Sequence, residues 1–164
     1  MRTKNIINGA VVSLLCAMVL TAEAANDRAA QEADKANPCY TMDVHVTNVT
    51  GVSCVLASSG TPTYGYFEDG HLPASIIRNG GTTNFHLTQR FGVSFGPDIT
   101  LSYLCGHKLV TFESQQSACV SIWAGRTSAT VLHEDKGVNL MYQKENPSRL
   151  FATPGRIRWF IRTD

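Results

Sequence analysis

The sequence DITLSYLC, residues 98–105, is followed by the dipeptide GH and then by KLVTFE, residues 108–113. In the first segment the apolar residues Ile99, Leu101 and Tyr103 alternate with hydroxyl-bearing residues. This period of two is typical of a half-buried β-strand. Two such segments joined by two residues predict a β-hairpin. The hairpin therefore indicates a β-rich chain. Several segments on either side of it show the same period of two.

Turn signals recur roughly every 8–12 residues after residue 38, which is typical of an antiparallel β-sandwich. No sustained helical pattern follows residue 38. The predicted fold class is therefore all-β, an antiparallel β-sandwich, and a small closed barrel is the alternative. The further predicted strands are Thr41–Asn48, Val52–Leu56, Tyr64–Phe67, Thr82–Gln89, Cys119–Ala124, Thr127–His133, Gly137–Gln143 and Arg156–Arg162.

The chain begins with a pattern typical of a secretory signal peptide. Arg2 and Lys4 precede the apolar stretch Ala10–Leu20, and an A-x-A site follows that ends at Ala24. The apolar stretch has 11 residues, whereas a membrane-spanning helix needs ~20. We therefore expect residues 1–24 to be removed on export rather than kept as a membrane anchor.

Removal of this segment would leave 140 residues with 12 basic and 12 acidic side chains. That length suits one domain with a real core, which we assign to residues 38–164, after a polar, Ala-rich leader at 25–37. The balanced charge argues against nucleic acid as a partner. The mature chain has no further apolar stretch of transmembrane length, so we expect a secreted or periplasmic protein without a transmembrane segment.

Cysteine usage supports export to an oxidising compartment. Cys16 falls within the predicted signal peptide, so an even number of cysteines remains, which indicates a disulfide framework. Four cysteines allow three pairings. We favour the two pairs that are close in sequence, because each would close a short segment. The cysteines in question are Cys39 with Cys54, and Cys105 with Cys119. A zinc site is the weaker alternative, because no C-x-x-C pair is present.

The last predicted strand has the most unusual pattern. Its alternate positions Arg156, Arg158, Phe160 and Arg162 place three guanidinium groups and a phenyl ring on one face. Guanidinium groups bind phosphates and carboxylates, and the ring can stack on a base, sugar or headgroup. The competing interpretation, which we favour, is a solvated face whose charges prevent pairing at a sheet edge.

The aromatic, glycine-flanked loop Phe91–Pro97 is a second candidate. Its residues Phe91 and Phe95 would suit an exposed apolar tip that contacts a membrane or a partner. We favour burial in the core, because large apolar side chains are usually buried.

The histidines show no H-x-H or H-E-x-x-H spacing, so we expect no metal site and exposed imidazoles. His45 and His86 occupy outward positions and would meet if their strands pair. The segment Glu68–His71 resembles a turn, and Asp98 a strand entry. The triplet Asn48–Thr50 matches the glycosylation sequon. The five histidines are His45, His71, His86, His107 and His133.

The segments VHVTNVTGVSC (44–54), DITLSYLC (98–105) and SQQSAC (114–119) resemble small exported proteins of Gram-negative bacteria. More distantly, the strand order and turn placement look like the aegerolysin and actinoporin type of lipid-binding β-sandwich. This resemblance implies a β-sandwich that binds a surface, and it transfers no functional residue.

No catalytic or cofactor motif was found in the sequence, so we expect no cofactor. The leading hypothesis is a non-enzymatic binding protein for a lipid, glycan or protein surface of a host or envelope. One alternative is a small hydrolase whose carboxylates or histidines converge only in three dimensions, in a concave pocket. Another is a structural or inhibitory envelope protein that acts through an exposed sheet edge.

Overall fold

The computed structural model describes residues 38–90, 92–119, 125–148 and 150–164. The predicted signal peptide (1–24) and leader (25–37), Phe91 and most of the predicted strand Cys119–Ala124 lie outside these residues. Among those described, no helix is both long and apolar enough to cross a membrane.

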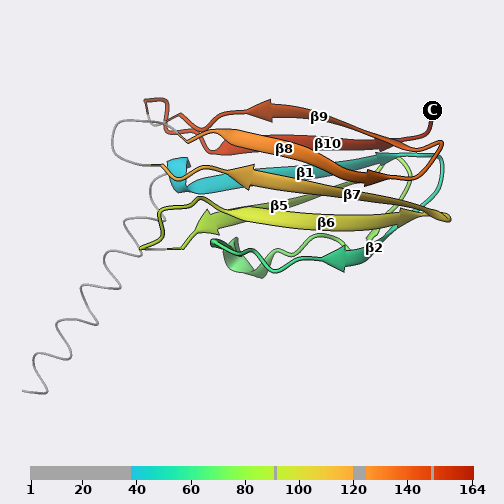
Figure 1. The fold of residues 1–164 in the computed structure, drawn as a ribbon, viewed down its shortest axis with the longest axis horizontal. Helices are drawn as coiled ribbons and strands as arrows, with labels where there is room; N and C mark the ends of the chain where they lie inside the picture. Colours follow the sequence, from blue (N-terminus) through green and yellow to red (C-terminus); the bar gives the residue numbers. More distant parts are fainter. Residues whose placement is uncertain (1–37, 91, 120–124, 149) are drawn as a thin grey trace, which may run out of the picture. The chain divides into compact units, whose positions relative to one another are not determined.

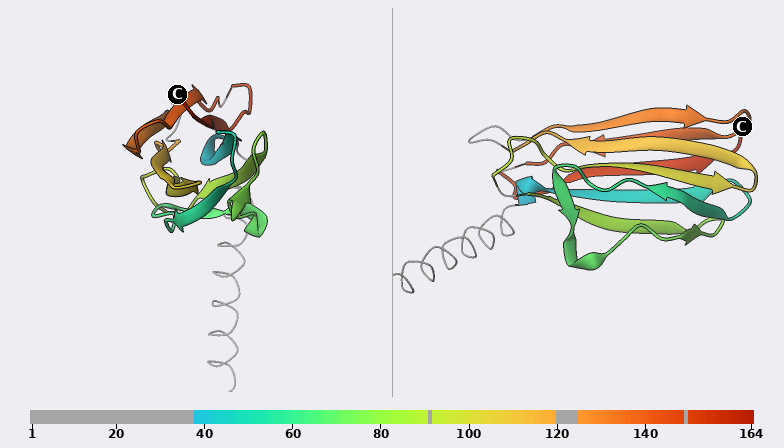
Figure 2. Two further views of the ribbon diagram at one scale, coloured as in Figure 1. Left: turned by 90° about the vertical axis from the view of Figure 1, so that its right-hand side faces the viewer. Right: turned by 60° about the horizontal axis from the view of Figure 1, so that its bottom comes forward.

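The described residues form two five-stranded sheets packed face to face (Figure 1). Viewed along the strands, the two layers enclose a common core (Figure 2). The predicted β-sandwich is confirmed, and the sheets do not close into the alternative barrel. In spatial order, sheet 1 contains β3 (Gly65–Phe67), β5 (Thr82–Gln89), β1 (Thr41–Val49), β10 (Gly155–Arg162) and β9 (Asn139–Glu145). Sheet 2 contains β4 (Ile76–Ile77), β2 (Cys54–Ser59), β6 (Asp98–Cys105), β7 (Lys108–Gln116) and β8 (Thr127–Glu134).

Two short 3-10 turns complete the described elements, η1 (Pro38–Tyr40) before β1 and η2 (Glu68–Gly70) after β3. The predicted hairpin joins β6 to β7, and its Gly106 adopts a φ of 64° that favours glycine. The two-residue strand β4 was not predicted, since it is too short to show a period. One pairing differs from the antiparallel expectation, because β1 and β10 run parallel.

The core consists of the inward-facing residues of both sheets. The last strand shows the pattern most clearly, with Ile157, Trp159 and Ile161 fully buried. The Trp159 ring lies 4.5 Å from that of Phe112 in the opposite sheet, centroid to centroid, and its Nε1 donates to Ser114 Oγ at 2.8 Å. Burial of these alternating side chains fixes the register of β10 between its neighbours.

Two disulfides are present, and their pairing differs from the one favoured by the sequence. Cys54 and Cys105 face each other on β2 and β6, and Cys39 is joined to Cys119. The pairing of near neighbours was wrong because each such pair is separated by a complete strand, β1 or β7. A nine-residue strand spans about 30 Å, far more than the ~7 Å between Cα atoms that a disulfide tolerates.

Candidate functional site

The four candidate residues of β10 lie on the outer face of sheet 1. Arg156, Arg158 and Phe160 are half-buried, and Arg162 is exposed. However, β10 lies between β1 and β9, so it is not an edge strand. The interpretation that its charges prevent edge pairing is therefore wrong, because neighbours cover both of its edges.

The arginines are held in an ion-pair network that crosses the sheet. Arg156 lies 3.3 Å from Asp43 on β1 and 3.4 Å from Glu145 on β9, and Arg158 lies 2.7 Å from the same glutamate. The other oxygen of Asp43 lies 2.6 Å from His86 Nδ1 on β5. The network links four adjacent strands, so the guanidinium groups of Arg156 and Arg158 already have carboxylate partners.

Arg162 differs from the other two arginines. Its Nε donates to the amide oxygen of Asn139 at 2.9 Å. It also lies at the last position of β10, at the end of the sandwich that carries the chain's C-terminus (Figure 1). The sequence predicted a row of three cationic groups. In the structure Arg156 and Arg158 are paired with carboxylates, and Arg162 is exposed.

A polar pocket opens beside this network. It has a volume of about 370 Å³ and is lined by Glu68, His71, Asn84 and His86. The segment Glu68–His71 is the turn that the sequence indicated, because η2 occupies Glu68–Gly70, but it also forms one wall of this pocket. The pocket is formed by two segments that no sequence motif connects. The only related prediction from the sequence was the outward position of His86.

His45 and His86 are on paired strands, β1 and β5. This pairing was the condition under which we expected the two histidines to meet. The antiparallel register places Asp43 opposite His86 and Asn84 opposite His45, so the two imidazoles are diagonal neighbours with different partners. Partial burial lowers the pKa of His45, whereas its hydrogen bond with Asn84 and the nearby Asp43 carboxylate act in the opposite direction. The neutral form of His45 is therefore favoured within the sheet.

The pocket tests the hydrolase alternative. It does bring one carboxylate and two imidazoles together. Its four lining residues include no hydroxyl or thiol that could act as a nucleophile. The described part of the chain also holds no group of three His, Cys, Asp or Glu residues that could bind a metal ion. The four lining residues offer hydrogen-bond donors and acceptors.

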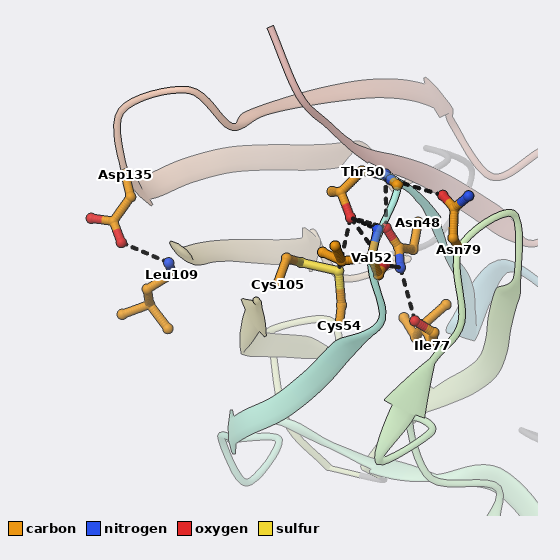
Figure 3. Close-up of a disulfide and its surroundings, with 10 residues drawn as sticks. Asn48, Thr50, Val52, Cys54, Ile77, Asn79, Cys105, Leu109 and Asp135 are labelled. Carbon is orange, nitrogen blue, oxygen red and sulfur yellow. Dashed lines mark hydrogen bonds between the residues drawn. A yellow bond between two sulfur atoms is a disulfide. The ribbon is translucent and has the colours of Figure 1, made fainter. Parts of the chain in front are cut away.

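The remaining histidines belong to sheet 2: His133 lies on β8, and His107 lies in the turn between β6 and β7. His133 Nε2 lies 3.0 Å from Asp135, whose second oxygen accepts the Leu109 N–H at 2.7 Å (Figure 3). This backbone hydrogen bond, with a smaller contribution from His133, lowers the pKa of the Asp135 carboxyl. His107 lines a smaller pocket of about 190 Å³ next to the Cys54–Cys105 disulfide.

Exposed apolar side chains lie in two connections at the end of the sandwich where β9 connects to β10. Leu150 and Phe151 in this connection are 86% and 76% exposed, the highest values among the large apolar residues described. The β5–β6 connection contributes Phe95, which is 57% exposed and stacks on Tyr64 with 4.7 Å between ring centroids. The expected burial of Phe95 was therefore wrong, and Phe91 lies outside the described residues.

Both connections pack closely against Gln116, the last residue of β7. Its amide nitrogen donates to the carbonyl of Cys39 at 2.8 Å. A Cβ added at Gly96 would collide with the Gln116 backbone, and one added at Gly155 would collide with its side chain. The Cys39–Cys119 disulfide lies at the same end, because Cys39 precedes β1 and Cys119 follows β7. We refer to Phe95, Leu150 and Phe151 below as the apolar end.

The two edge strands on one side of the sandwich also expose apolar groups. Val131 and Leu132 on β8 are 37% and 51% exposed, and Met141 and Tyr142 on β9 are 48% and 44% exposed. All four are less exposed than Leu150 and Phe151, and each belongs to a regular strand. The exposed apolar side chains of this edge would support the structural or inhibitory alternative. They are less exposed than those of the apolar end, which would support surface binding, so we favour the apolar end.

Comparisons with known proteins find similarity in structure alone. No family model and no curated protein matches the sequence. Solved structures that share the fold include three of particular interest. IP-1A from Alcaligenes faecalis has a TM-score of 0.56 at 16% identity, covering 81% of this chain and 97% of its own. The lipid-binding protein Nakanori has a TM-score of 0.57 at 17% identity, covering 93% and 85%. RahU, solved with a TRIS molecule, has a TM-score of 0.58 at 8% identity, covering 77% and 97%.

Proposed function

We propose that this protein is an exported, non-enzymatic binding protein that attaches to a lipid surface through its apolar end. In this proposal residues 1–24 are a signal peptide, residues 25–37 are a leader, and residues 38–164 form the single binding domain. The two disulfides suit an oxidising compartment outside the cytoplasm. The fold shared with the lipid-binding protein Nakanori is compatible with this function.

The observation that carries the proposal is the exposure of Leu150 and Phe151. Adjacent leucine and phenylalanine side chains with this exposure leave apolar surface in water that a soluble domain normally buries. A phenylalanine and a leucine at the tip of a connection can enter the boundary between lipid headgroups and acyl chains without any change in the sandwich. Phe95 adds a third apolar side chain at the same end.

The base of the apolar end is well ordered, which favours a fixed docking surface. Pro147 is buried, and Ser148 and Thr153 exchange two backbone hydrogen bonds of 2.9 Å across the β9–β10 connection. Gln116 and the Cys39–Cys119 disulfide anchor the segments beneath it. A base that is fixed before binding reduces the conformational entropy that binding costs.

The outer face of β10 has a different role in this proposal. Arg156 and Arg158 hold sheet 1 together through Asp43 and Glu145. Arg162 lies at the opposite end of β10 from the connection to β9, so it cannot contact a flat surface touched by that connection. We expect replacement of all three arginines to change stability more than lipid binding.

Co-sedimentation with vesicles tests the proposal. The mature protein is mixed with phosphatidylcholine vesicles and with vesicles that also contain phosphatidylglycerol. The double variant Leu150→Ser/Phe151→Ser should bind about 100-fold more weakly, because each side chain contributes roughly 1.5 kcal/mol when it leaves water. Leu72→Ser/Ile76→Ser is the matched control, since these residues are 63% and 56% exposed elsewhere. Equal binding by both double variants, or no binding by the wild type, would overturn the proposal.

A further inference from the structure

The polar pocket beside η2 has the composition of a ligand site of its own. Glu68 and His71 come from the turn after β3, and Asn84 and His86 come from the outer face of β5. Its volume of about 370 Å³ is within the range of sites that hold small molecules. It lies on the face of sheet 1, and it shares no lining residue with the apolar end.

Hydrogen bonds hold the β5 wall of the pocket in place. His86 Nδ1 pairs with Asp43, which Arg156 holds from the other side. With Nδ1 engaged by a carboxylate, the second ring nitrogen, Nε2, is the one left for a ligand. Asn84 is positioned by its side-chain hydrogen bond with His45. Both ligand-facing groups of β5 are therefore oriented before any ligand arrives.

The η2 wall is also fixed. The backbone N–H of His71 donates to the carbonyl of Glu68 at 3.1 Å, which closes the turn. The Glu68 carboxylate accepts from Thr88 Oγ1 at 3.4 Å, and this threonine is buried beneath it. Two carboxylate oxygens provide about four acceptor sites, so one hydroxyl partner leaves most of this capacity for a ligand.

The Glu68 carboxylate makes the pocket unfavourable for an anionic ligand. Glu68 is the only lining residue with a permanent charge, and it is negative. The nearest arginine of the network, Arg156, is engaged by Asp43 and Glu145. A phosphate or carboxylate ligand would therefore face a carboxylate with no free guanidinium to compensate, and like charges repel.

We propose that this pocket binds a single neutral sugar residue through adjacent hydroxyl groups. A carboxylate, an amide and two imidazoles supply both acceptors and donors, as hydroxyl pairs require because each hydroxyl donates once and accepts twice. Glu68 accepts from the sugar hydroxyls, His86 Nε2 hydrogen-bonds to one of them, and the Asn84 amide donates to another. The ligand class goes beyond the proposed attachment to lipid, since it needs neither the apolar end nor a membrane.

Titration followed by NMR of the imidazole resonances tests this assignment with methyl α-mannopyranoside, methyl β-galactopyranoside and myo-inositol as probes. The buffer contains no Tris, because that hydroxylated ammonium ion would compete. At least one probe should shift the His71 and His86 resonances and saturate below about 100 mM, which corresponds to weak binding by one small ligand. Inorganic phosphate should produce no saturable shift.

Glu68→Ala and Asn84→Ala should each weaken sugar binding at least tenfold. Gln143→Ala is the matched control, because it is an exposed amide on β9 of the same sheet, and it should bind as the wild type does. The assignment is wrong if none of the probes saturates, or if both pocket variants bind as tightly as the control.

Two further arms separate this site from the lipid proposal. Vesicles that carry a galactosyl lipid distinguish a membrane-borne sugar from a free one. If the natural ligand is a sugar on a lipid headgroup, the protein should bind these vesicles more tightly than plain vesicles. If the ligand is a free sugar, the protein should bind both kinds of vesicle equally. Leu150→Ser/Phe151→Ser should keep its affinity for free sugar while it loses vesicle binding. Loss of both activities in this variant would contradict a separate sugar site.

Discussion

Asn48 and Thr50 bind each other inside the domain. The Asn48 side-chain oxygen accepts the Thr50 N–H at 3.0 Å and the Thr50 hydroxyl at 2.8 Å (Figure 3). These are the first and third residues of the glycosylation sequon, and Asn48 has no exposed surface. The sequon therefore spans the last two residues of β1 and the first residue of the turn to β2, and it is inaccessible to modification once the domain has folded.

Asn48→Ala should destabilise the domain strongly. The Asn48 amide nitrogen also donates to the carbonyls of Val52 and Ile77, at 2.7 and 2.8 Å. The variant would leave the buried Ile77 carbonyl without this donor, and it would remove the Asn48 side-chain oxygen that accepts from Thr50. We therefore expect a loss of about 3 kcal/mol in urea unfolding. Asn79→Ala is the control, because Asn79 is exposed and accepts only the Gly51 N–H. A loss below 1 kcal/mol for Asn48→Ala would contradict the structural role of its amide.

The hydrogen bond between Trp159 and Ser114 should be visible in a double-mutant cycle. Both residues are fully buried, and they join the two sheets. Trp159→Phe removes the donor and leaves the Ser114 hydroxyl unpaired, which should cost about 2 kcal/mol beyond the loss of packing. Adding Ser114→Ala should recover about 1 kcal/mol of that loss, because no polar group then remains unpaired. Strictly additive effects of the two substitutions would show that the hydrogen bond contributes nothing.

Much of the fold could be predicted from the sequence because burial of one sheet face imposes a period of two. Strands Thr82–Gln89 and Asp98–Cys105 were predicted with their observed bounds. The parallel pairing of β1 with β10 could not be predicted, since it joins segments from the two ends of the domain. The disulfides depend on the same long-range pairing, because Cys54 meets Cys105 only when β2 and β6 are in register.

The candidate sites were less accessible to sequence reasoning. Alternation in the last strand correctly placed Arg156 and Arg158 on the outer face, but their carboxylate partners lie on two other strands. The polar pocket combines a turn with a strand that begins after a further β-segment, so no local motif marks it. Leucine and phenylalanine side chains are usually buried. The sequence alone therefore predicts burial of Leu150 and Phe151, whereas both are exposed.

Stability should fall as the pH decreases through the range in which His45 titrates. Partial burial lowers the pKa of His45 below its ordinary value of 6.5. The unfolded chain therefore binds this proton more readily than the folded domain does, and acidification below about pH 6.5 favours unfolding. The penalty grows until the pH falls below the folded-state pKa, and it is absent at alkaline pH.

His45→Gln should remove this part of the pH dependence, measured as urea unfolding between about pH 5 and 8. Asn84→Ala should lower the pKa of His45 further in an NMR titration, because it removes the hydrogen bond that opposes the effect of burial. A His45 resonance that titrates at or above 6.5 in the wild type would contradict the proposed cause.

The two disulfides should differ in what they stabilise, although both close long loops. The cysteines are 80 and 51 residues apart in sequence, so the chain-entropy model assigns each about 4 kcal/mol. Cys54→Ser/Cys105→Ser loosens two adjacent strands of one sheet and should lower stability without changing vesicle binding by the remaining folded protein. Cys39→Ser/Cys119→Ser releases the segments beneath the apolar end, so it should lower stability and weaken vesicle binding together. Thermal unfolding and vesicle co-sedimentation of both variants, below their unfolding temperatures, separate these effects. Equal vesicle binding by the two variants would show that the Cys39–Cys119 disulfide does not order the docking surface.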